Sequence, residues 1–220
     1  EDARFEFFGA PIAYMPFFSH PDPTVKQRSG FLRPNYVYDK DLGFAAEIPY
    51  YFALAPDYDM TVSVTTYTIQ GPLGEFEWRQ RLERGSYSIR GAGIHQLDPD
   101  KFDPNTVDYT ENRGVIQTDG LFEINDFWKW GWDGTLVSDP TFMRTYSLTN
   151  AYETRDQVFL TGQSARNWFD ARMVHYQLFV DPIRNNNAAQ PLIHPVIDYN
   201  YIFDDSVMGG QLAMNFNALS

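Results

Sequence analysis

The chain has 220 residues, a net charge of −12 and no cysteine. The acidic balance disfavours nucleic acid as a partner, because phosphate contacts need Lys and Arg. The missing cysteines exclude disulfides, Cys-ligated metals and thiol nucleophiles, and the apolar runs are far shorter than the roughly 20 residues of a membrane-spanning helix.

The first 28 residues differ from the rest of the chain. They begin Glu1-Asp2-Ala3 without a basic, apolar leader, so we expect an excised segment rather than a signal peptide. Short apolar runs are broken by Gly9 and Pro16, and residues 20–23 stop any strand, because proline lacks the N–H that a ladder needs. Residues 1–28 are therefore expected to be the tail of a preceding β-domain and a linker.

From residue 29 onward apolar and polar residues alternate, as in residues 60–65 and 75–81. This period of two places one apolar and one polar face on a strand, and no segment shows the stripe of an amphipathic helix. The pattern predicts about eleven antiparallel strands, each close to the roughly 9–11 residues of a tilted membrane strand. The expected strands are 30–38, 43–53, 59–70, 74–83, 85–95, 114–126, 131–138, 157–164, 168–180, 192–204 and 208–219.

Three expected connections are long: 96–113, 139–156 and 181–191. They are the fifth, seventh and ninth connections, so in an antiparallel sheet all three lie at the same end. Outer-membrane barrels have this asymmetry, with short periplasmic turns and longer extracellular loops.

Large aromatic residues gather at the opposite, short-turn end. Barrels in membranes place aromatic girdles at the lipid–water boundaries, which favours the same orientation. The alternative is that these side chains form the core of a β-sandwich. The girdle candidates are Tyr50, Tyr51, Trp128, Trp130, Trp132 and Trp168.

Four charged residues share one face of the expected strand 74–83, opposite Phe76 and Trp78. Lipid cannot face them, since Arg or Lys at mid-bilayer costs about 2–4 kcal/mol. They are expected to line an interior, where they contact sugar, phosphate or a plug protein, or form a solvated wall with mutual ion pairs. The four residues are Glu75, Glu77, Arg79 and Arg81.

Several short motifs occur in an order that resembles the LptD family of lipopolysaccharide-assembly proteins. Residues 9–18 (GAPIAYMPFF) are similar to the family's segment that closes the periplasmic domain. Residues 29–34 (SGFLRP) resemble the entry to its first barrel strand, and residues 49–59 (PYYFALAPDYD) resemble its second strand. Weaker similarities follow at 74–79 (GEFEWR) and 137–142 (VSDPTF).

This resemblance implies an all-β chain containing the end of a periplasmic β-jelly roll (1–28) and the first part of a large transmembrane β-barrel (29–220). It implies transport of lipopolysaccharide into the outer leaflet of a Gram-negative outer membrane. The implied partners are an LptE-like plug lipoprotein, an LptA-like jelly-roll bridge and membrane lipid, and no cofactor is implied. The absence of the cysteines that tie jelly roll to barrel in some family members is a departure from the pattern.

The resemblance also singles out Pro34 and Pro49 in the first two barrel strands. Each proline removes one ladder donor. In the family, the lipid is thought to leave sideways beside the first strand, so the two prolines are expected to weaken a lateral gate. The alternative is that they mark strand ends or bulges.

No catalytic or metal motif emerges from the sequence. Asp98, Asp100 and Asp103 lie between prolines and indicate a solvated turn, with a cation site as the alternative. No nucleophile elbow or phosphate-binding loop appears. We expect no enzyme and no metal site, since the histidines lack ligand spacing. Two other functions stay open: a soluble β-sandwich or jelly-roll carbohydrate-binding module, and a diffusion porin. The four histidines are His20, His95, His175 and His194.

Overall fold

The computed structural model describes residues 3–7, 10–15, 27–179, 192–205 and 208–219. Strands β1 (Ala3–Phe7) and β2 (Ala10–Met15) form a two-stranded antiparallel sheet. The remaining strands form one twelve-stranded sheet. The alternating pattern therefore correctly predicts an all-β, antiparallel chain.

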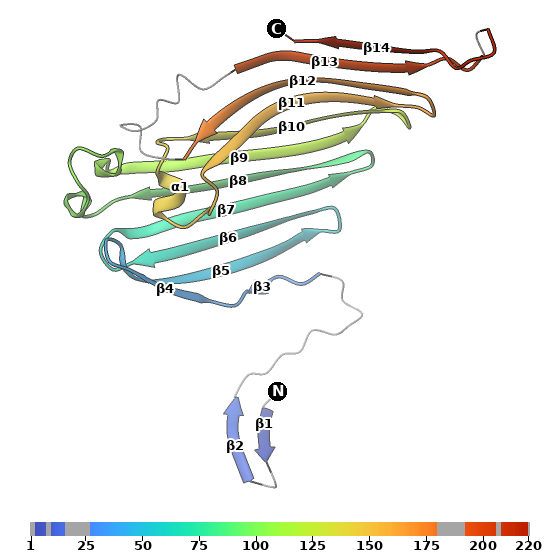
Figure 1. Cartoon of the computed structure of the whole chain (residues 1–220). Helices are drawn as coiled ribbons and strands as arrows, with labels where there is room; N and C mark the ends of the chain where they lie inside the picture. Colours follow the sequence, from blue (N-terminus) through green and yellow to red (C-terminus); the bar gives the residue numbers. More distant parts are fainter. Residues whose placement is uncertain (1–2, 8–9, 16–26, 180–191, 206–207, 220) are drawn as a thin grey trace.

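In the large sheet the strands follow one another in chain order, and each pairs antiparallel with the next (Figure 1). The one departure is at the edge, where β3 and β4 both pair with β5. The predicted strand 30–38 is thus split in two, and the other ten predicted strands each have one counterpart. The strands are β3 (Gly30–Phe31), β4 (Asn35–Asp39), β5 (Gly43–Ala55), β6 (Tyr58–Tyr67), β7 (Gly71–Leu82), β8 (Gly85–His95), β9 (Asn112–Glu123), β10 (Trp128–Val137), β11 (Glu153–Gln163), β12 (Asn167–Leu178), β13 (Leu192–Ile202) and β14 (Ala213–Ala218).

The register gives the sheet two faces of different chemistry. Thr61, Glu77, Arg90 and Gln117 lie opposite one another across β6 to β9, and we call their side of the sheet the inner face. The neighbouring row lies on the outer face and is apolar: Val62, Phe76, Gly91 and Ile116. One residue of slippage would exchange the two faces, so the alternation fixes the register.

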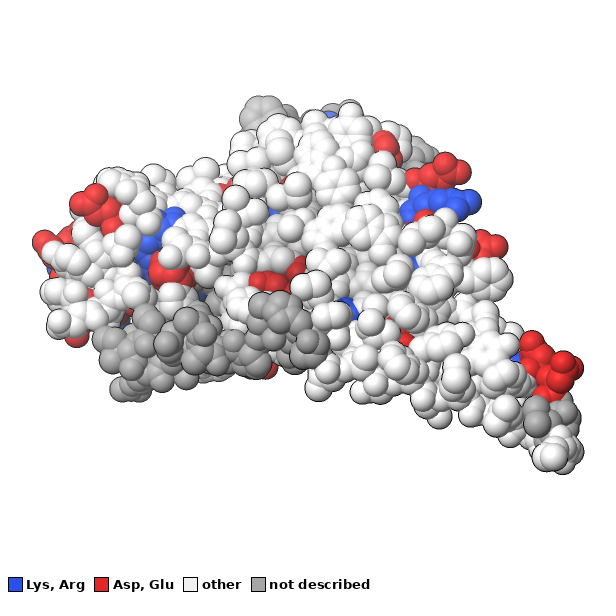
Figure 2. All heavy atoms as spheres, turned by 90° about the horizontal axis from the view of Figure 1, so that it is seen from above, with Lys and Arg blue, Asp and Glu red and all other residues white. Residues whose placement is uncertain are grey.

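The outer face is covered with exposed apolar side chains. Ile48 and Val158 are each 57% exposed, and no other described segment covers them. Glycines let aromatic rings lie flat on this face: Phe76 covers Gly91 and Trp132 covers Gly120, where a Cβ atom would collide with the ring. Figure 2 shows charged side chains gathered towards the two ends of the molecule and sparse between them.

Two long connections fold against the inner face. Residues 96–111 contain the short 3₁₀ turns η1 (Pro99–Lys101) and η2 (Val107–Tyr109), and residues 138–152 contain one turn of helix, α1 (Phe142–Thr145). Figure 1 shows α1 lying over the middle strands. These turns were not predicted, because a single turn is too short to show a helical period. The third long connection, 181–191, falls outside the described residues.

The core of the molecule lies between α1 and the long-connection end of the inner face. Phe142 is fully buried and Tyr146 nearly so, and each such side chain stabilises the contact by about 1.5–3 kcal/mol. The inner face is therefore apolar where the loop covers it and polar beyond. The buried members of this core are Leu42, Ala45, Tyr67, Leu73, Ile94, Val115, Phe142, Met143, Tyr146 and Phe179.

The last hairpin differs from the prediction. A strand from 208 was expected, but β14 begins at Ala213. Met208 and Gly209 have φ angles of 52° and 80°. Left-handed backbone cannot continue a strand, so the alternation in this segment begins before the strand does.

Candidate functional site

The edge of the sheet is interrupted at the two prolines. The β3 pairing runs from Gly30 opposite Tyr51 to Phe31 opposite Tyr50, and the β4 pairing resumes one residue out of register with Asn35 opposite Glu47. Residues 32–34, which include Pro34, belong to neither strand. The slip has the two-against-one count of a β-bulge.

Pro49 is the other half of the interruption. The Leu32 N–H donates to the Pro49 carbonyl over 2.9 Å. In an antiparallel ladder such a pair normally exchanges two hydrogen bonds, but Pro49 has no N–H to return. The backbone position that lacks an N–H therefore faces the edge strand. On its other side Pro49 lies opposite Ser63 of β6. Sequence reasoning selected both prolines but could not place this donor.

The four charged residues of β7 share the inner face, as the alternation predicts. Glu77 pairs with Arg90 at 3.0 Å, and Arg79 pairs with Asp59 at 2.7 Å. Arg81 lies opposite Ser86 in the register on the same face. Both arginines of these ion pairs are about half exposed, so each pair contributes about 0–1 kcal/mol. These pairs make the face polar but add little to the stability of the sheet.

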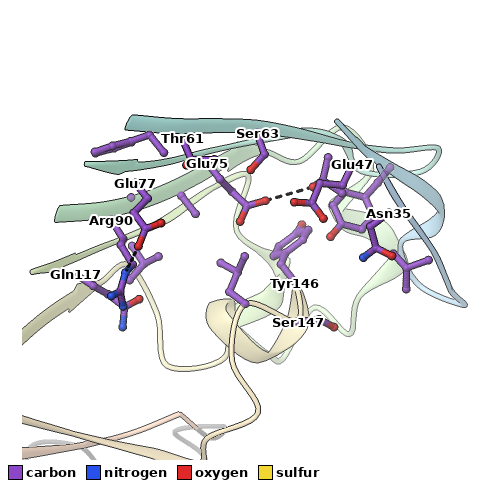
Figure 3. Close-up of a pocket in the computed structure, with 18 of the residues that line it drawn as sticks. Asn35, Glu47, Thr61, Ser63, Glu75, Glu77, Arg90, Gln117, Tyr146 and Ser147 are labelled. Atoms are coloured by element: carbon purple, nitrogen blue, oxygen red, sulfur yellow. Dashed lines mark hydrogen bonds and ion pairs between the residues drawn. The ribbon is translucent and has the colours of Figure 1, made fainter. Parts of the chain in front are cut away.

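Glu75 points into a cavity of about 440 Å³ on the inner face (Figure 3). Its carboxylate accepts a hydrogen bond from the Thr65 hydroxyl at 3.3 Å and lies near Glu47 from β5. Hydroxyls of β6 line one side, and Tyr146 from the connection 138–152 closes another. The cavity joins the edge strand to the loop-covered end of the face, and its walls offer many hydrogen-bond acceptors.

A buried ion cluster fixes the connection 138–152 over that cavity. The Arg113 side chain is fully buried in β9, and its Nε and Nη2 donate to both carboxylate oxygens of Asp139 at 2.9 and 2.7 Å. Asp108 from the preceding connection lies 2.9 Å from the same guanidinium. Asp139 also accepts the Phe142 backbone N–H at 2.9 Å, so the carboxylate caps α1.

Two buried glutamines complete the attachment. Gln96 donates to the carbonyls of Asp108 and Thr110 at 2.8 and 2.7 Å and accepts from the Tyr146 hydroxyl. Gln70 donates to the Asp98 carbonyl at 2.8 Å. Buried amides with all partners satisfied hold loops rigidly. No spacing rule links these residues, so no sequence signal could have identified them.

Burial raises the pKa of Asp139, but the hydrogen bonds and charge of Arg113 outweigh it and hold the pKa below the ordinary value of 3.8. Because the folded state favours the carboxylate, this stabilisation is complete above pH 3.8 and is lost as the pH falls through the lower, folded value. We expect hydrogen exchange of residues 142–148 to be unchanged from pH 8 to pH 5 once corrected for intrinsic rates. Protection should drop below pH 4. A D139N variant should be less protected at neutral pH and lack the acid step. An acid step that persists in D139N would assign it to another group.

The predicted aromatic girdle is divided between the two faces. Trp130 and Trp132 lie on the outer face with Phe122, their rings stacked or tilted at 5.4 to 5.8 Å. Trp128 packs against Phe169 and Tyr50 against Phe52 on the same face. These rings lie in the half of the outer face nearer the short turns, and their placement at a lipid boundary stays a prediction.

Tyr51 and Trp168 differ from the prediction. The Tyr51 hydroxyl donates to Asp59 on the inner face at 3.2 Å. Trp168 lies opposite Asn200, on the same face of the sheet as the pair Asp170 and Asp198. Each is adjacent in sequence to an outward residue, so alternation places it inward. Neither belongs to the outer aromatic band.

The described residues contain no cluster of three or more His, Cys, Asp or Glu side chains arranged to hold a metal ion. Among them no helix has the length and apolarity to cross a bilayer. The arrangement is suited to binding polar groups on one face and apolar groups on the other.

These features define an all-β chain whose single large sheet separates a polar face from an apolar one. The model of the family "LptD: LPS transport system D" matches residues 111–220. The chain belongs to the LptD family.

Individual relatives match nearly the whole chain. It is 30% identical over 216 residues to the LPS-assembly protein LptD of Yersinia enterocolitica and to that of Escherichia coli K12, covering 93% of this chain and 26% of each relative. The LptD of Actinobacillus pleuropneumoniae is 28% identical over 222 residues, covering 96% of this chain and 27% of the relative. The chain thus spans about a quarter of the length of these relatives.

Proposed function

We propose that this chain forms part of the wall of an outer-membrane translocon that inserts lipopolysaccharide into the outer leaflet. The outer face meets hydrocarbon and the inner face lines a watery lumen. The names of the relatives support the substrate, and the uncovered apolar face supports the placement in a membrane. The bands of Trp128, Trp130, Trp132 and Tyr50 lie at the lipid boundary on the short-turn, periplasmic side.

The wider assembly follows from the same proposal. Residues 1–28 are the end of a periplasmic jelly roll that receives the lipid from an LptA-like bridge. Residues 29–220 begin the barrel, which an LptE-like lipoprotein plugs. The chain moves lipopolysaccharide without chemistry of its own, in the outer membrane of a Gram-negative bacterium.

The lipid leaves sideways at the edge strand. The observation that carries this step is the interrupted ladder between residues 32–34 and Pro49. A missing hydrogen bond changes stability by about 0.5–1.5 kcal/mol in water and by several in lipid. An edge strand that lacks bonds at two neighbouring points separates from its partner at lower cost. The polar head then passes while the acyl chains stay in hydrocarbon.

We expect the double variant P34A/P49A to export lipopolysaccharide more slowly than the wild type. Alanine restores two N–H donors, and the new N–H at position 49 can donate to the Leu32 carbonyl, which tightens the edge. The measurement is the rate at which newly made lipopolysaccharide reaches the cell surface in cells that depend on the full-length variant, at equal protein level.

P72A is the matched control. Pro72 also lies in a strand, in β7 opposite Thr66 of β6, but away from the edge. Its export should equal that of the wild type. Undiminished export in P34A/P49A, or an equal loss in P72A, would remove the gate from the proposal.

A further inference from the structure

The sheet has a second interruption, between β10 and β11. Their pairing ends at Asp133 opposite Gln157. Beyond that point β10 stays paired with β9 as far as Val137, and β11 stays paired with β12 back to Glu153. The two strands therefore diverge like a fork towards the long-connection end, and residues 134–137 have no ladder with residues 153–156.

Side chains replace the missing ladder inside this fork. Asp156 accepts the Thr135 backbone N–H at 2.9 Å, and Gln177 donates to the Thr135 carbonyl at 2.7 Å. Gln177 also donates to Asp156, which joins the two groups into one bridge. The bridge satisfies both backbone groups of Thr135, which would be costly to leave unpaired in hydrocarbon, without closing the fork.

A hollow of about 510 Å³ lies at the fork, and its outward lining is apolar apart from Thr118 and the cross-strand pair Asp156 and His175. A second hollow of about 500 Å³ continues from it along the outer face towards Trp130. Val158 and Met173 line both, so the two form one groove over β10 to β12. The outward side chains that shape it include Ile116, Leu136, Val158, Leu160, Ala171 and Met173.

We propose that this groove holds one acyl chain of a bilayer lipid from the leaflet at the long-connection end. The site rests on the proposed membrane placement. The groove is continuous with the outer face proposed to meet hydrocarbon. Between Val158 and Trp130 its outward lining is apolar, so water there would lack polar partners. The charged or titratable lining residues are Asp133, Asp156 and His175 at the fork and Arg172, which faces inward and pairs with Asp170. From Val158 towards Trp130 the outward lining side chains are uncharged. An uncharged alkyl chain complements such a track.

The test is photolabelling of the full-length protein with its natural partners. The protein is placed in phosphatidylethanolamine and phosphatidylglycerol vesicles that contain a phospholipid with a diazirine in its acyl chain. At low lipid-to-protein ratios we expect label on Val158 and Met173 to exceed label on Val64 about tenfold, since a site outcompetes a loose lipid shell. Val64 is a fair reference because it is outward and 44% exposed on β6.

Two variants locate the effect. V158W fills the point where the hollows join and should reduce label on Met173 to the level of Val64. V64W makes the same change elsewhere and should leave Met173 labelling unchanged. If V158W does not assemble, the wild-type comparison of Val158 with Val64 still decides.

Equal labelling of Val158 and Val64 in the wild type overturns the lipid site while leaving the membrane placement intact. Crosslinking of the groove to another polypeptide overturns it in favour of a protein contact. Absence of label from both residues contradicts the membrane placement itself and, with it, the site. Surface export of lipopolysaccharide, measured in parallel, reports on the proposed function independently of these outcomes.

Discussion

Replacing Arg113 with methionine is expected to lower the free energy of opening of residues 138–152 by about 3–5 kcal/mol, because it leaves buried carboxylates without their cation. Asp139 and Asp108 both contact the guanidinium within 2.9 Å, and the Arg113 side chain has no exposure to solvent. The measurement is native-state hydrogen exchange of the amides of Tyr146 and Leu148, which donate within this loop.

The matched control is R90M. Arg90 also lies on the inner face and pairs with Glu77, but its side chain is 51% exposed. Water screens this pair, so the expected change is about 0–1 kcal/mol. Equal effects of R113M and R90M would show that the cluster does not fix the loop.

Replacing Phe76 with arginine is expected to destabilise the assembled protein by about 2–4 kcal/mol, the cost of a cation on the lipid face near mid-bilayer. Phe76 lies in the middle of β7, points outward and is 43% exposed. The measurement is unfolding by urea of the full-length protein in lipid vesicles, together with the amount of folded protein in outer membranes.

Q117R is the matched control on the face proposed to line the lumen. Gln117 lies in the same cross-strand region on the inner face, opposite Arg90. An arginine there stays in water and should change stability by less than about 1 kcal/mol, the range of ordinary surface changes. If F76R were as mild as Q117R, the outer face would not meet hydrocarbon, and the soluble β-sandwich alternative would regain support.

Alternation was sufficient to predict the sheet and its faces. Because side chains alternate strictly, placing Phe76 outward places Glu75 and Glu77 inward with no further information. The same rule, applied residue by residue, would have assigned Tyr51 and Trp168 to the inner face. Those two assignments were wrong because nearness to a turn does not determine which face of the sheet a side chain occupies.

The loop attachments could not be predicted in this way. Arg113, Asp139 and Asp108 come from different connections and strands, and their meeting depends on how two long loops fold back. The fork between β10 and β11 was equally hidden. Residues 134–137 belonged to an expected strand, but residues 153–156 were expected to lie in the connection 139–156, whereas they extend β11 along β12. The proline interruption was partly visible: the residues were identified, but the direction of the missing donor requires the register.

From β5 to β14 the strands pair in strict chain order, and this has a consequence for biogenesis. Each strand from β5 onward needs only its immediate predecessor as a template, so the wall can grow one hairpin at a time. The core around α1 joins residues of β5 to β9 with Phe179, which follows β12, so it is complete only once β12 is added. The attachment of residues 138–152 to the inner face is therefore expected to become complete only late in assembly, while the edge formed by β3 and β4 has no further described strand beside it.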